Sequence, residues 1–492
     1  MIPRDQCLEK AFHPRAVAIV GVSRNDVDST PDYTGLKILR LLQGAGFEGQ
    51  LYPINPSAAT IAGVKAYPTV IAVPERLDLV IVAVPAAAVP QVLEDCAIAG
   101  ALNVHICSAG FSETGEVEGA KIEKRVRDIA LRGDFQVVGP NCLGYHVPSA
   151  HLNMYMNVPL AQGPVAFVSQ SGGHAQTFVT HGPALGIGFS KVISYGNALM
   201  MDSTDFLEYL ATDSETSIIC LYIEGVKDGG RLIRLVREIG PSKPVIVWKG
   251  GLTSSGARAA VTHTSSLSGD KRIWEAFFKQ TGAIGVDSIE EMADVTMTFL
   301  RLKPLLRANV AVLVGGGGNS VANADMCARE GVAVPALANE TRMRLMKLLS
   351  LVNQSIVNPI DSPRVLYDPS LLRQVLDTVA ADPLIDVIIL HISTIFRRRA
   401  SAETVAGFKK CIADFGKQDS SSKPVVVAMR AAETSGGEAE VLIREMREAN
   451  ITTYYSLRSA CRALKLFAGY HAFMAQNRAG QPSAPQALTG RP

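Results

Sequence analysis

The stretch Ala16-Val-Ala-Ile-Val-Gly-Val-Ser-Arg-Asn (residues 16–25) decides the fold class of the first part of the chain. Its five leading apolar residues predict a buried strand, and Gly21 predicts a tight turn directly after that strand. Residues 35–42 then have the pattern of a helix. A strand, a glycine turn and a helix in this order are typical of the first unit of a Rossmann-like α/β domain.

Four further apolar segments, at residues 50–56, 77–85, 103–110 and 135–142, continue this series, and each ends in small or polar residues. In an open parallel sheet, ligands bind at the carboxyl ends of the strands. We therefore expect one edge of the sheet to be lined by the residues that end these strands. Together with the turn residue Gly21 they are Ser23, Asn55, Pro56, Val84, Pro85, Ser108, Ala109 and Gly110.

The turn after the first strand argues against a dinucleotide as the ligand of this crevice. The dinucleotide fingerprint is G-x-G-x-x-G, and only its first glycine, Gly21, is present. An NAD(P)-dependent oxidoreductase is therefore a disfavoured alternative.

A second α/β unit begins at Gly163-Pro-Val-Ala-Phe-Val-Ser-Gln-Ser-Gly-Gly (residues 163–173), where a strand runs into a Ser/Gly turn and a helix. Backbone amides and the helix dipole make such a turn an anion site, with Ser171, Gly172 and Gly173 nearest a bound phosphate. A serine-hydrolase elbow, G-x-S-x-G, would require glycine at position 169, where this chain has Ser169. Residues 145–163 between the two units have the composition of an irregular connector.

One long polar segment, residues 249–269, follows the predicted strand at residues 244–248 and contains His263. Long loops inside compact domains are uncommon unless they are functional, and we expect this one to lie at the surface. A lone histidine in such a loop is more often a solvated surface residue than a catalytic one, so its role depends on the rest of the chain.

The third part of the chain repeats landmarks of the second. Val310-Ala-Val-Leu-Val-Gly-Gly-Gly-Gly-Asn (310–319) has the shape of residues 165–174, and Lys423-Pro-Val-Val-Val (423–427) repeats Lys243-Pro-Val-Ile-Val (243–247). This repetition predicts that the third part of the chain is a doubly wound domain related to the unit that begins at residue 163. After its Lys-Pro strand, however, no histidine follows until His471. This copy therefore keeps a glycine-rich loop of the phosphate-binding type but has no counterpart of His263.

The segment Gly-Ala-Arg-Ala-Ala-Val-Thr-His-Thr-Ser-Ser-Leu-Ser-Gly (256–269) resembles the phosphohistidine loop of the ADP-forming (NDP-forming) acyl-CoA synthetases, relatives of the succinyl-CoA ligase alpha subunit. Thr262, Ser265 and Leu252 differ from the usual residues of that loop. The strand-end motifs at 20–23, 53–56, 84–85 and 108–111 resemble the family's CoA-binding domain, and Asn-Pro-x-Asp at 358–361 resembles its third domain.

The resemblance implies functional roles for particular residues. His263 would carry a phosphoryl group, and Glu224, at the end of the strand predicted at 217–225, would hold the imidazole in the required tautomer. Asn141, with Ser171, Gly172 and Gly173, would bind phosphate, and the strand-end residues from Gly21 to Gly110 named above would bind CoA. Because neither a P-loop nor an ATP-grasp region is evident, ATP or ADP with Mg²⁺ would bind on an ATP-grasp beta subunit, giving a hetero-oligomer.

Composition narrows the remaining choices. The net charge of +2 gives no basic surface for nucleic acid, and no apolar run is suited to a signal peptide or a membrane span. The eight cysteines are scattered among apolar residues without a C-x-x-C pair, which is typical of a cytoplasmic protein with reduced thiols. We find no pattern of metal ligands.

The sequence therefore predicts an α/β protein with a Rossmann-like CoA-binding domain (1–145), two related doubly wound, flavodoxin-like ligase domains (146–303 and 304–475) and a disordered tail (476–492). The predicted activity is that of an acyl-CoA synthetase alpha subunit, which joins a small carboxylic acid to CoA through acyl phosphate and phosphohistidine. The alternative is a non-catalytic module that binds acyl-CoA.

Overall fold

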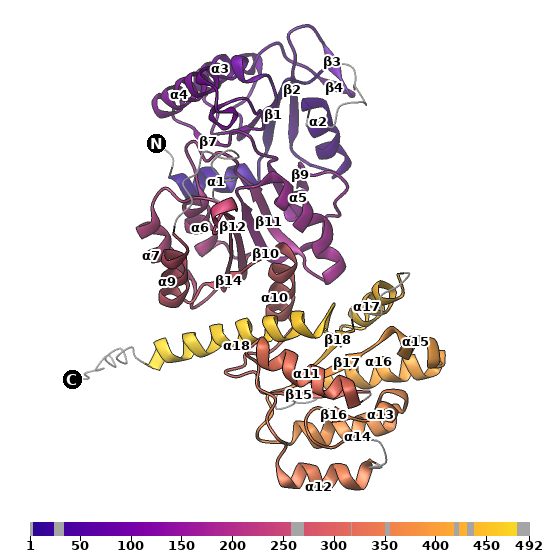
Figure 1. Ribbon diagram of the computed structural model, residues 1–492. Helices are drawn as coiled ribbons and strands as arrows, with labels where there is room; N and C mark the ends of the chain where they lie inside the picture. The colour runs from indigo at the N-terminus through magenta and orange to yellow at the C-terminus, as the bar shows by residue number, and fades with distance from the viewer. Residues whose placement is uncertain are drawn as a thin grey trace, which may run out of the picture. The chain divides into compact units, whose positions relative to one another are not determined.

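The computed structural model describes residues 3–23, 34–256, 270–315, 317–349, 355–417, 423–430 and 437–479. The chain divides into two compact units, residues 1–292 and 293–492 (Figure 1). The first unit contains two large sheets and the second unit contains one. All three sheets are built mainly from parallel strands, as the α/β prediction requires.

The first sheet has the strand order β2-β1-β5-β6-β7 and is entirely parallel. Every residue of β1 is buried, because helices cover both faces: α2 lies on one side, and α3 and α4 lie on the other (Figure 1). After β1 the next strand, β2, is added on one side of the sheet, whereas β5, β6 and β7 are added on the other side. The order of the strands therefore reverses between β1 and β5, and we call this point the change of direction of the sheet. The elements are α1 (Arg4–Phe12), β1 (Ala16–Val20), α2 (Gly35–Gly44), β2 (Gln50–Ile54), β3 (Thr60–Ile61), β4 (Val64–Lys65), η1 (Val70–Ala72), β5 (Leu79–Val82), η2 (Ala86–Ala88), α3 (Val89–Ala99), β6 (Asn103–Ile106), η3 (Ser112–Thr114), α4 (Val117–Arg132) and β7 (Gln136–Val138).

The second sheet has the order β14-β13-β12-β10-β11-β8-β9. Helix α5 packs on one face, and α6, α7 and α9 lie on the other (Figure 1). The change of direction falls between β10 and β12. The elements are β8 (Tyr145–Val147), η4 (Pro148–Ala150), β9 (Leu152–Asn153), β10 (Gln162–Ser169), α5 (Gly172–His181), η5 (Gly182–Leu185), β11 (Phe189–Ser194), α6 (Ser203–Thr212), β12 (Ile218–Ile223), α7 (Gly229–Ile239), β13 (Val245–Lys249), α9 (Lys271–Thr281), β14 (Ile284–Val286) and α10 (Ile289–Arg301).

The prediction of an irregular connector at residues 145–163 was wrong in its first half. Residues 145–147 and 152–153 form the antiparallel strands β8 and β9, which extend the second sheet beyond β11. Their backbone amides and carbonyls pair with β11 and with each other, a long-range interaction that such short segments do not reveal in sequence.

The second unit contains a parallel sheet of order β16-β15-β17-β18-β19. Its first strand is flanked by the second and third strands, as β10 is flanked by β11 and β12, so the topology agrees with the repeat found in the sequence. The elements are β15 (Val310–Val314), α11 (Gly317–Arg329), α12 (Asn339–Leu348), β16 (Ile360–Asp361), α13 (Pro363–Tyr367), α14 (Pro369–Ala380), β17 (Val387–Ile392), α15 (Thr394–Arg399), α16 (Ala402–Lys417), β18 (Val425–Met429), α17 (Glu438–Glu448), β19 (Thr453–Tyr454) and α18 (Leu457–Ala479).

The predicted disordered tail begins too early. Helix α18 continues through residues 476–479, and the remaining tail residues, 480–492, lie outside the described part of the chain. Among the helices that the structure describes, none combines the length and apolar character needed to cross a membrane.

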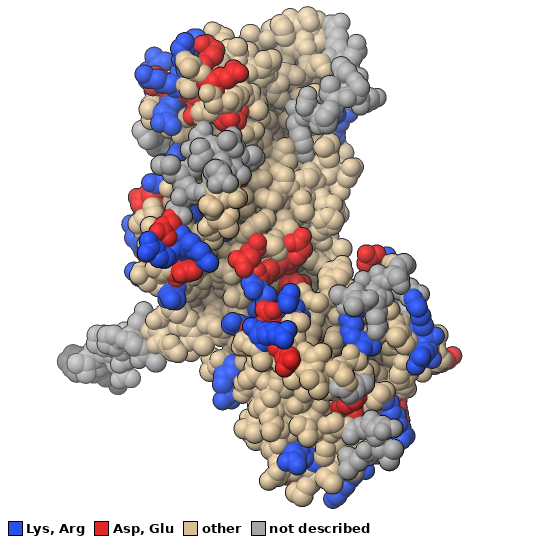
Figure 2. Space-filling view, viewed as in Figure 1, with Lys and Arg blue, Asp and Glu red and all other residues tan. Residues whose placement is uncertain are grey.

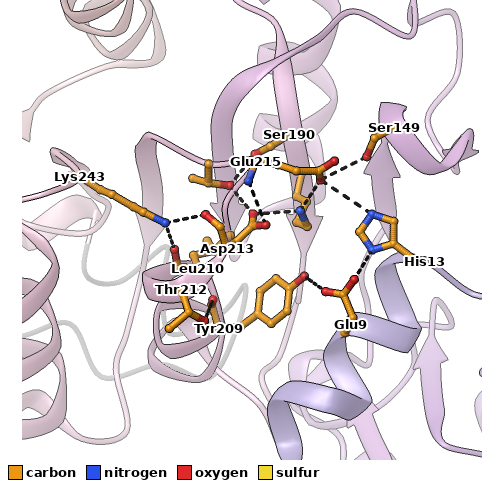
Figure 3. A network of polar contacts seen from close by, with 12 residues as sticks. Glu9, His13, Ser149, Ser190, Tyr209, Leu210, Thr212, Asp213, Glu215 and Lys243 are labelled. Atoms are coloured by element: carbon orange, nitrogen blue, oxygen red, sulfur yellow. Dashed lines mark hydrogen bonds and ion pairs between the residues drawn. The ribbon is translucent and has the colours of Figure 1, made fainter.

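A network of polar contacts, buried at Lys191 and partly exposed at Glu9, joins α1 to the second sheet (Figure 3). The fully buried ammonium of Lys191 pairs with Asp213 at 2.9 Å and with Glu215 at 2.7 Å. His13, just after α1, contacts Glu215 at 3.8 Å and Glu9 at 3.0 Å. These contacts hold the first helix against the second sheet and so help to hold the two sheets together.

Charged side chains on the face drawn in Figure 2 are of both signs, interspersed over α3 and α4 and over α7 and α9. Over these described elements, the surface has no extended field of one sign.

Candidate active site

A crevice opens at the carboxyl ends of β1 and β5, where the first sheet changes direction. It encloses about 360 Å³ and is lined by five of the predicted residues, Gly21, Ser23, Asn55, Pro56 and Val84. The neighbouring η1–α3 region completes its wall through Pro68, Thr69, Val70, Val92 and Asp95, which the strand-end rule did not identify. This is the position at which open α/β sheets bind ligands.

Gly21 is required at this crevice for two reasons. Its φ of +92° is unfavourable for residues with a side chain, and a Cβ at this position would lie 2.3 Å from the carbonyl oxygen of Ala83. The close approach brings the turn after β1 against the turn after β5. A ligand can therefore meet backbone atoms of both turns.

Asn55 and Ser108 hold these turns in place through hydrogen bonds to the protein. The Asn55 amide donates to the carbonyl of Val22 at 2.7 Å, and its oxygen accepts from the amide of Ala58 at 3.0 Å. The Ser108 hydroxyl donates to the carbonyl of Val84 at 2.5 Å. Four of the predicted residues follow the ends of β5 and β6, as expected, but do not line the 360 Å³ crevice: Pro85, Ser108, Ala109 and Gly110.

A chain of hydrogen bonds connects the end of β6 to the second sheet. The backbone amide of Asn141 donates to the carbonyl of Ser108 at 2.9 Å, and the Asn141 side chain contacts Asn197 at 3.3 Å. Asn197 donates to Glu113 at 2.6 Å, and Glu113 in turn accepts from the amide of Gly110 at 2.7 Å. Asn141 thus lies between the crevice and the second sheet. Neither Glu113 nor Asn197 was predicted as a site residue, because no local pattern marks either one.

The predicted anion site lies at the start of α5. Ser171 is the N-cap of this helix, and its hydroxyl accepts from the amide of His174 at 3.4 Å. The first amides of a helix have no partner within the helix, so the amides of Gly172 and Gly173 are suited to hold an anion. Gly172 also has a packing role, because a Cβ there would lie 2.7 Å from Leu143.

Glu224 lies beside this helix start, directly after β12. The side chain of Gln170, between β10 and α5, accepts from the amides of Glu224 at 2.8 Å and Gly225 at 3.1 Å. The side-chain oxygen of Gln170 therefore links the ends of β10 and β12, the two strands between which the second sheet changes direction. Gln170 is a positioning residue that the sequence did not single out.

The Glu224 carboxylate is buried and accepts a hydrogen bond from the phenol of Tyr222 at 3.1 Å. Burial and the adjacent Glu224 charge raise the pKa of Tyr222, so the phenol remains a donor at neutral pH. The Tyr222 ring packs on His174 and Trp248, with ring centroids 4.5 Å and 4.7 Å away. The hydrogen bond from Tyr222, whose ring is held by this packing, thus helps to orient the carboxylate.

The structure does not describe residues 257–269, and His263, Thr262 and Ser265 fall within that range. The structure describes the residues on both sides: residues 254–256 form a helical turn, and Asp270 caps α9. Both flanks follow β13, the strand next to β12. Among the described residues, no cluster of three or more His, Cys, Asp or Glu side chains is arranged to hold a metal ion.

Two family models match this chain. Residues 15–148 match a CoA binding domain, and residues 162–299 match a succinyl-CoA ligase like flavodoxin domain. The first match covers the sheet with the 360 Å³ crevice, and the second covers strands β10 to β14 of the second sheet, with Glu224 and the start of α5.

Individual relatives match this chain over both of its units. The alpha subunit of ADP-forming acetate–CoA ligase II from Pyrococcus furiosus is 36% identical over 437 residues, 88% of this chain and 92% of the relative. ADP-forming acetate–CoA ligase I from Archaeoglobus fulgidus is 33% identical over 96% of this chain, which spans 65% of that longer protein. The solved structure of acetyl-coenzyme A synthetase 1 from Ca. Korarchaeum cryptofilum, described as a complex with phosphate and ADP, is 29% identical, with a TM-score of 0.81 over 96% of this chain and 99% of that one.

Proposed function

This chain belongs to the family of ADP-forming acyl-CoA ligases, and from that membership we propose that it is the CoA-binding, phosphohistidine-bearing subunit of such an enzyme. The proposed reaction converts a carboxylic acid, CoA and ATP into acyl-CoA, ADP and phosphate. One observation carries the proposal. Glu224, whose carboxylate is buried, donates its backbone amide to the side chain of Gln170 just before α5, at the point where the second sheet changes direction.

The arrangement around Glu224 suits a histidine that carries phosphate. A nucleophilic imidazole needs its second nitrogen held as N–H, and a fixed carboxylate provides the acceptor. In the proposal, that imidazole is His263, and Ser171, Gly172, Gly173 and Asn141 bind the phosphoryl group. The phosphoryl group passes from His263 to the acid carboxylate, so that the N–P bond breaks as the O–P bond forms.

We assign CoA to the crevice of the first sheet. Gly21, Ser23, Asn55, Pro56 and Val84 would contact it directly, and Pro85, Ser108, Ala109 and Gly110 would continue the contact surface toward Asn141. The CoA sulfur then attacks the acyl carbon of the acyl phosphate, phosphate leaves, and the thiol proton is lost with it. The hydrogen-bond chain from Ser108 to Asn197 links the two sites that this step must bring together.

The nucleotide is assigned to a partner. Two relatives from Pyrococcus furiosus are named as alpha subunits, which supports a second subunit in the assembly. We assign to that subunit an ATP-grasp site for ATP or ADP with Mg²⁺. All eight cysteines are free thiols, which supports a reducing, cytoplasmic location.

The test is phosphorylation of His263. The chain is incubated with γ-labelled ATP, with and without its ATP-grasp partner, and the experiment is repeated with His263→Ala. We expect label only with the partner, lost in mild acid because the phosphate is on nitrogen, and absent from the variant. Label that persists in His263→Ala would overturn the proposal. Binding of acyl-CoA without any labelling would instead favour the non-catalytic module.

A further inference from the structure

A second pocket, of about 730 Å³, lies in the first unit between α7 and α9. Its walls are mainly apolar and include Leu232 and Ile233 from α7 and Trp274 and Phe277 from α9. The volume lies within the range of small-molecule sites, and the lining is of the usual kind for them, apolar with few polar groups. None of these residues lines the crevice assigned to CoA.

Lys249, the last residue of β13, supplies the charge in this pocket. The residue is only 4% exposed, and its ammonium lies 5.4 Å from the centroid of the Trp274 ring. Its hydrogen bond goes to the carbonyl of Gly250, and it forms no ion pair with any described carboxylate. Burial lowers the pKa of Lys249 to about 8, because water no longer solvates the ammonium, and the Glu224 charge partly offsets this effect.

The other charged groups of the pocket pair with each other. Asp270 and Arg272, at the start of α9, form an ion pair of 2.8 Å at the surface. Among the residues that line the pocket, this pair leaves the charge of Lys249 over, next to an aromatic and aliphatic surface; Glu224 is the nearest further charge and does not line the pocket. The Lys249 charge and this surface are complementary to a single negative charge attached to an apolar group.

The pocket adjoins the proposed phosphoryl-transfer site. Strands β12 and β13 pair in register, with Lys249 opposite Ile223, the residue before Glu224. A carboxylate bound to Lys249 would therefore lie close to the residue assigned to hold the phosphohistidine.

We propose that this pocket binds the acid substrate and that the substrate is a monocarboxylate with a bulky apolar group, such as an aryl-alkyl or branched acid. The assignment of the ligand as substrate rests on the function proposed above. The carboxylate pairs with Lys249, and the apolar group packs against Leu232, Ile233, Trp274 and Phe277. Acetate would leave most of this apolar surface uncovered, so the pocket favours larger acids.

Binding can be measured without turnover. The full-length chain, without nucleotide or CoA, is titrated by calorimetry with 3-phenylpropionate, 3-methylbutyrate, acetate and the neutral analogue 3-phenylpropan-1-ol. The chain has two tryptophans, so in a Trp248→Phe background the fluorescence of Trp274 reports on this pocket alone. We expect 3-phenylpropionate and 3-methylbutyrate each to bind more tightly than acetate, and 3-phenylpropionate to bind at least about tenfold more tightly than acetate or the alcohol, since acetate lacks the apolar group and the alcohol lacks the charge.

Lys249→Met removes the charge and keeps most of the volume, and we expect it to weaken 3-phenylpropionate binding about tenfold or more while leaving the alcohol unchanged. Lys279→Met, at an exposed lysine of α9 that does not line the pocket, is the matched control. Equal affinity for the acid and the alcohol in the unsubstituted chain would overturn the proposal, and this comparison holds even if Lys249→Met does not fold.

The two proposals fail in different ways. If acetate is activated but 3-phenylpropionate neither binds nor changes Trp274 fluorescence, the pocket assignment is wrong and the ligase activity stands. If 3-phenylpropionate binds at Lys249 but His263 is never labelled, the pocket stands and the proposed reaction is wrong.

Discussion

Replacing Glu224 with Gln tests the role of the carboxylate with little change in shape. The amide oxygen of Gln can still accept from the phenol of Tyr222, and the backbone hydrogen bonds to Gln170 do not involve the side chain that is changed. The fold around β12 should therefore be retained. What is lost is the negative charge that would hold the imidazole N–H and stabilise the positive charge developing on the ring.

We expect phosphorylation of His263 to slow by about 10²-fold, the usual contribution of an acid–base partner, which corresponds to about 2.7 kcal/mol. CoA affinity should remain nearly unchanged, because the crevice lined by Gly21 and Asn55 is on the other sheet. Rapid-quench labelling with γ-labelled ATP and the partner subunit measures the rate, and calorimetry measures CoA binding.

The controls separate charge from structure. Glu238→Gln changes an exposed carboxylate on α7 and should label at the normal rate. Glu224→Asp keeps the charge on a shorter side chain and should recover part of the rate. If Glu224→Gln is phosphorylated as fast as the unsubstituted chain, the carboxylate has no part in the transfer and the assignment of its role is refuted.

Three further predictions follow from particular contacts. Tyr222→Phe removes the hydrogen bond to Glu224 but keeps the ring packing, so labelling of His263 should slow about tenfold in rapid-quench assays with little change in thermal stability. Gly21→Ala should lower the free energy of unfolding by about 3 kcal/mol, since a Cβ at a φ of +92° would clash with the Ala83 carbonyl. Both the midpoint of thermal unfolding and the affinity for CoA should fall, and unchanged values would contradict the prediction. Affinity for 3-phenylpropionate should be constant between about pH 6, where the ligand carboxylate is ionised, and about pH 8. Above about pH 8 it should fall by up to tenfold per pH unit, as Lys249 loses its proton in the free pocket. Glu224, Asp270 and Arg272 are the other charged groups nearby, and an affinity that does not change from about pH 6 to about pH 10 would exclude the ammonium as the partner.

Much of the architecture was predictable from local sequence because it depends on local properties. Runs such as residues 16–20 and 310–314 are apolar throughout, which is the pattern of strands covered on both faces, and both are buried strands in the structure. The helix predicted after the Ser/Gly turn is α5, and Ser171 caps it because a serine oxygen satisfies an amide of the first helical turn. The repeat between the second and third sheets was also visible in sequence, because equivalent strands and turns need similar residues.

The sequence located Glu224 at a strand end but did not reveal what surrounds it. Its amide is held by Gln170, 54 positions earlier in the chain, and its carboxylate is oriented by a phenol whose ring packs on α5 and β13. The link from Ser108 through Asn141 to Asn197 likewise depends on how two sheets lie together. The roles of His263 and of the CoA-binding residues stay predictions.

The sequence by itself determined the principal parallel strands, the turns that end them and the candidate nucleophile. Only the tertiary structure decided that residues 145–153 add two strands to the second sheet, and that Lys249 faces an apolar pocket between α7 and α9. The physical reason is the range of the interactions. Strand and turn preferences arise from neighbouring residues, whereas burial of a charge and the partner of a hydrogen bond depend on segments that meet only after folding.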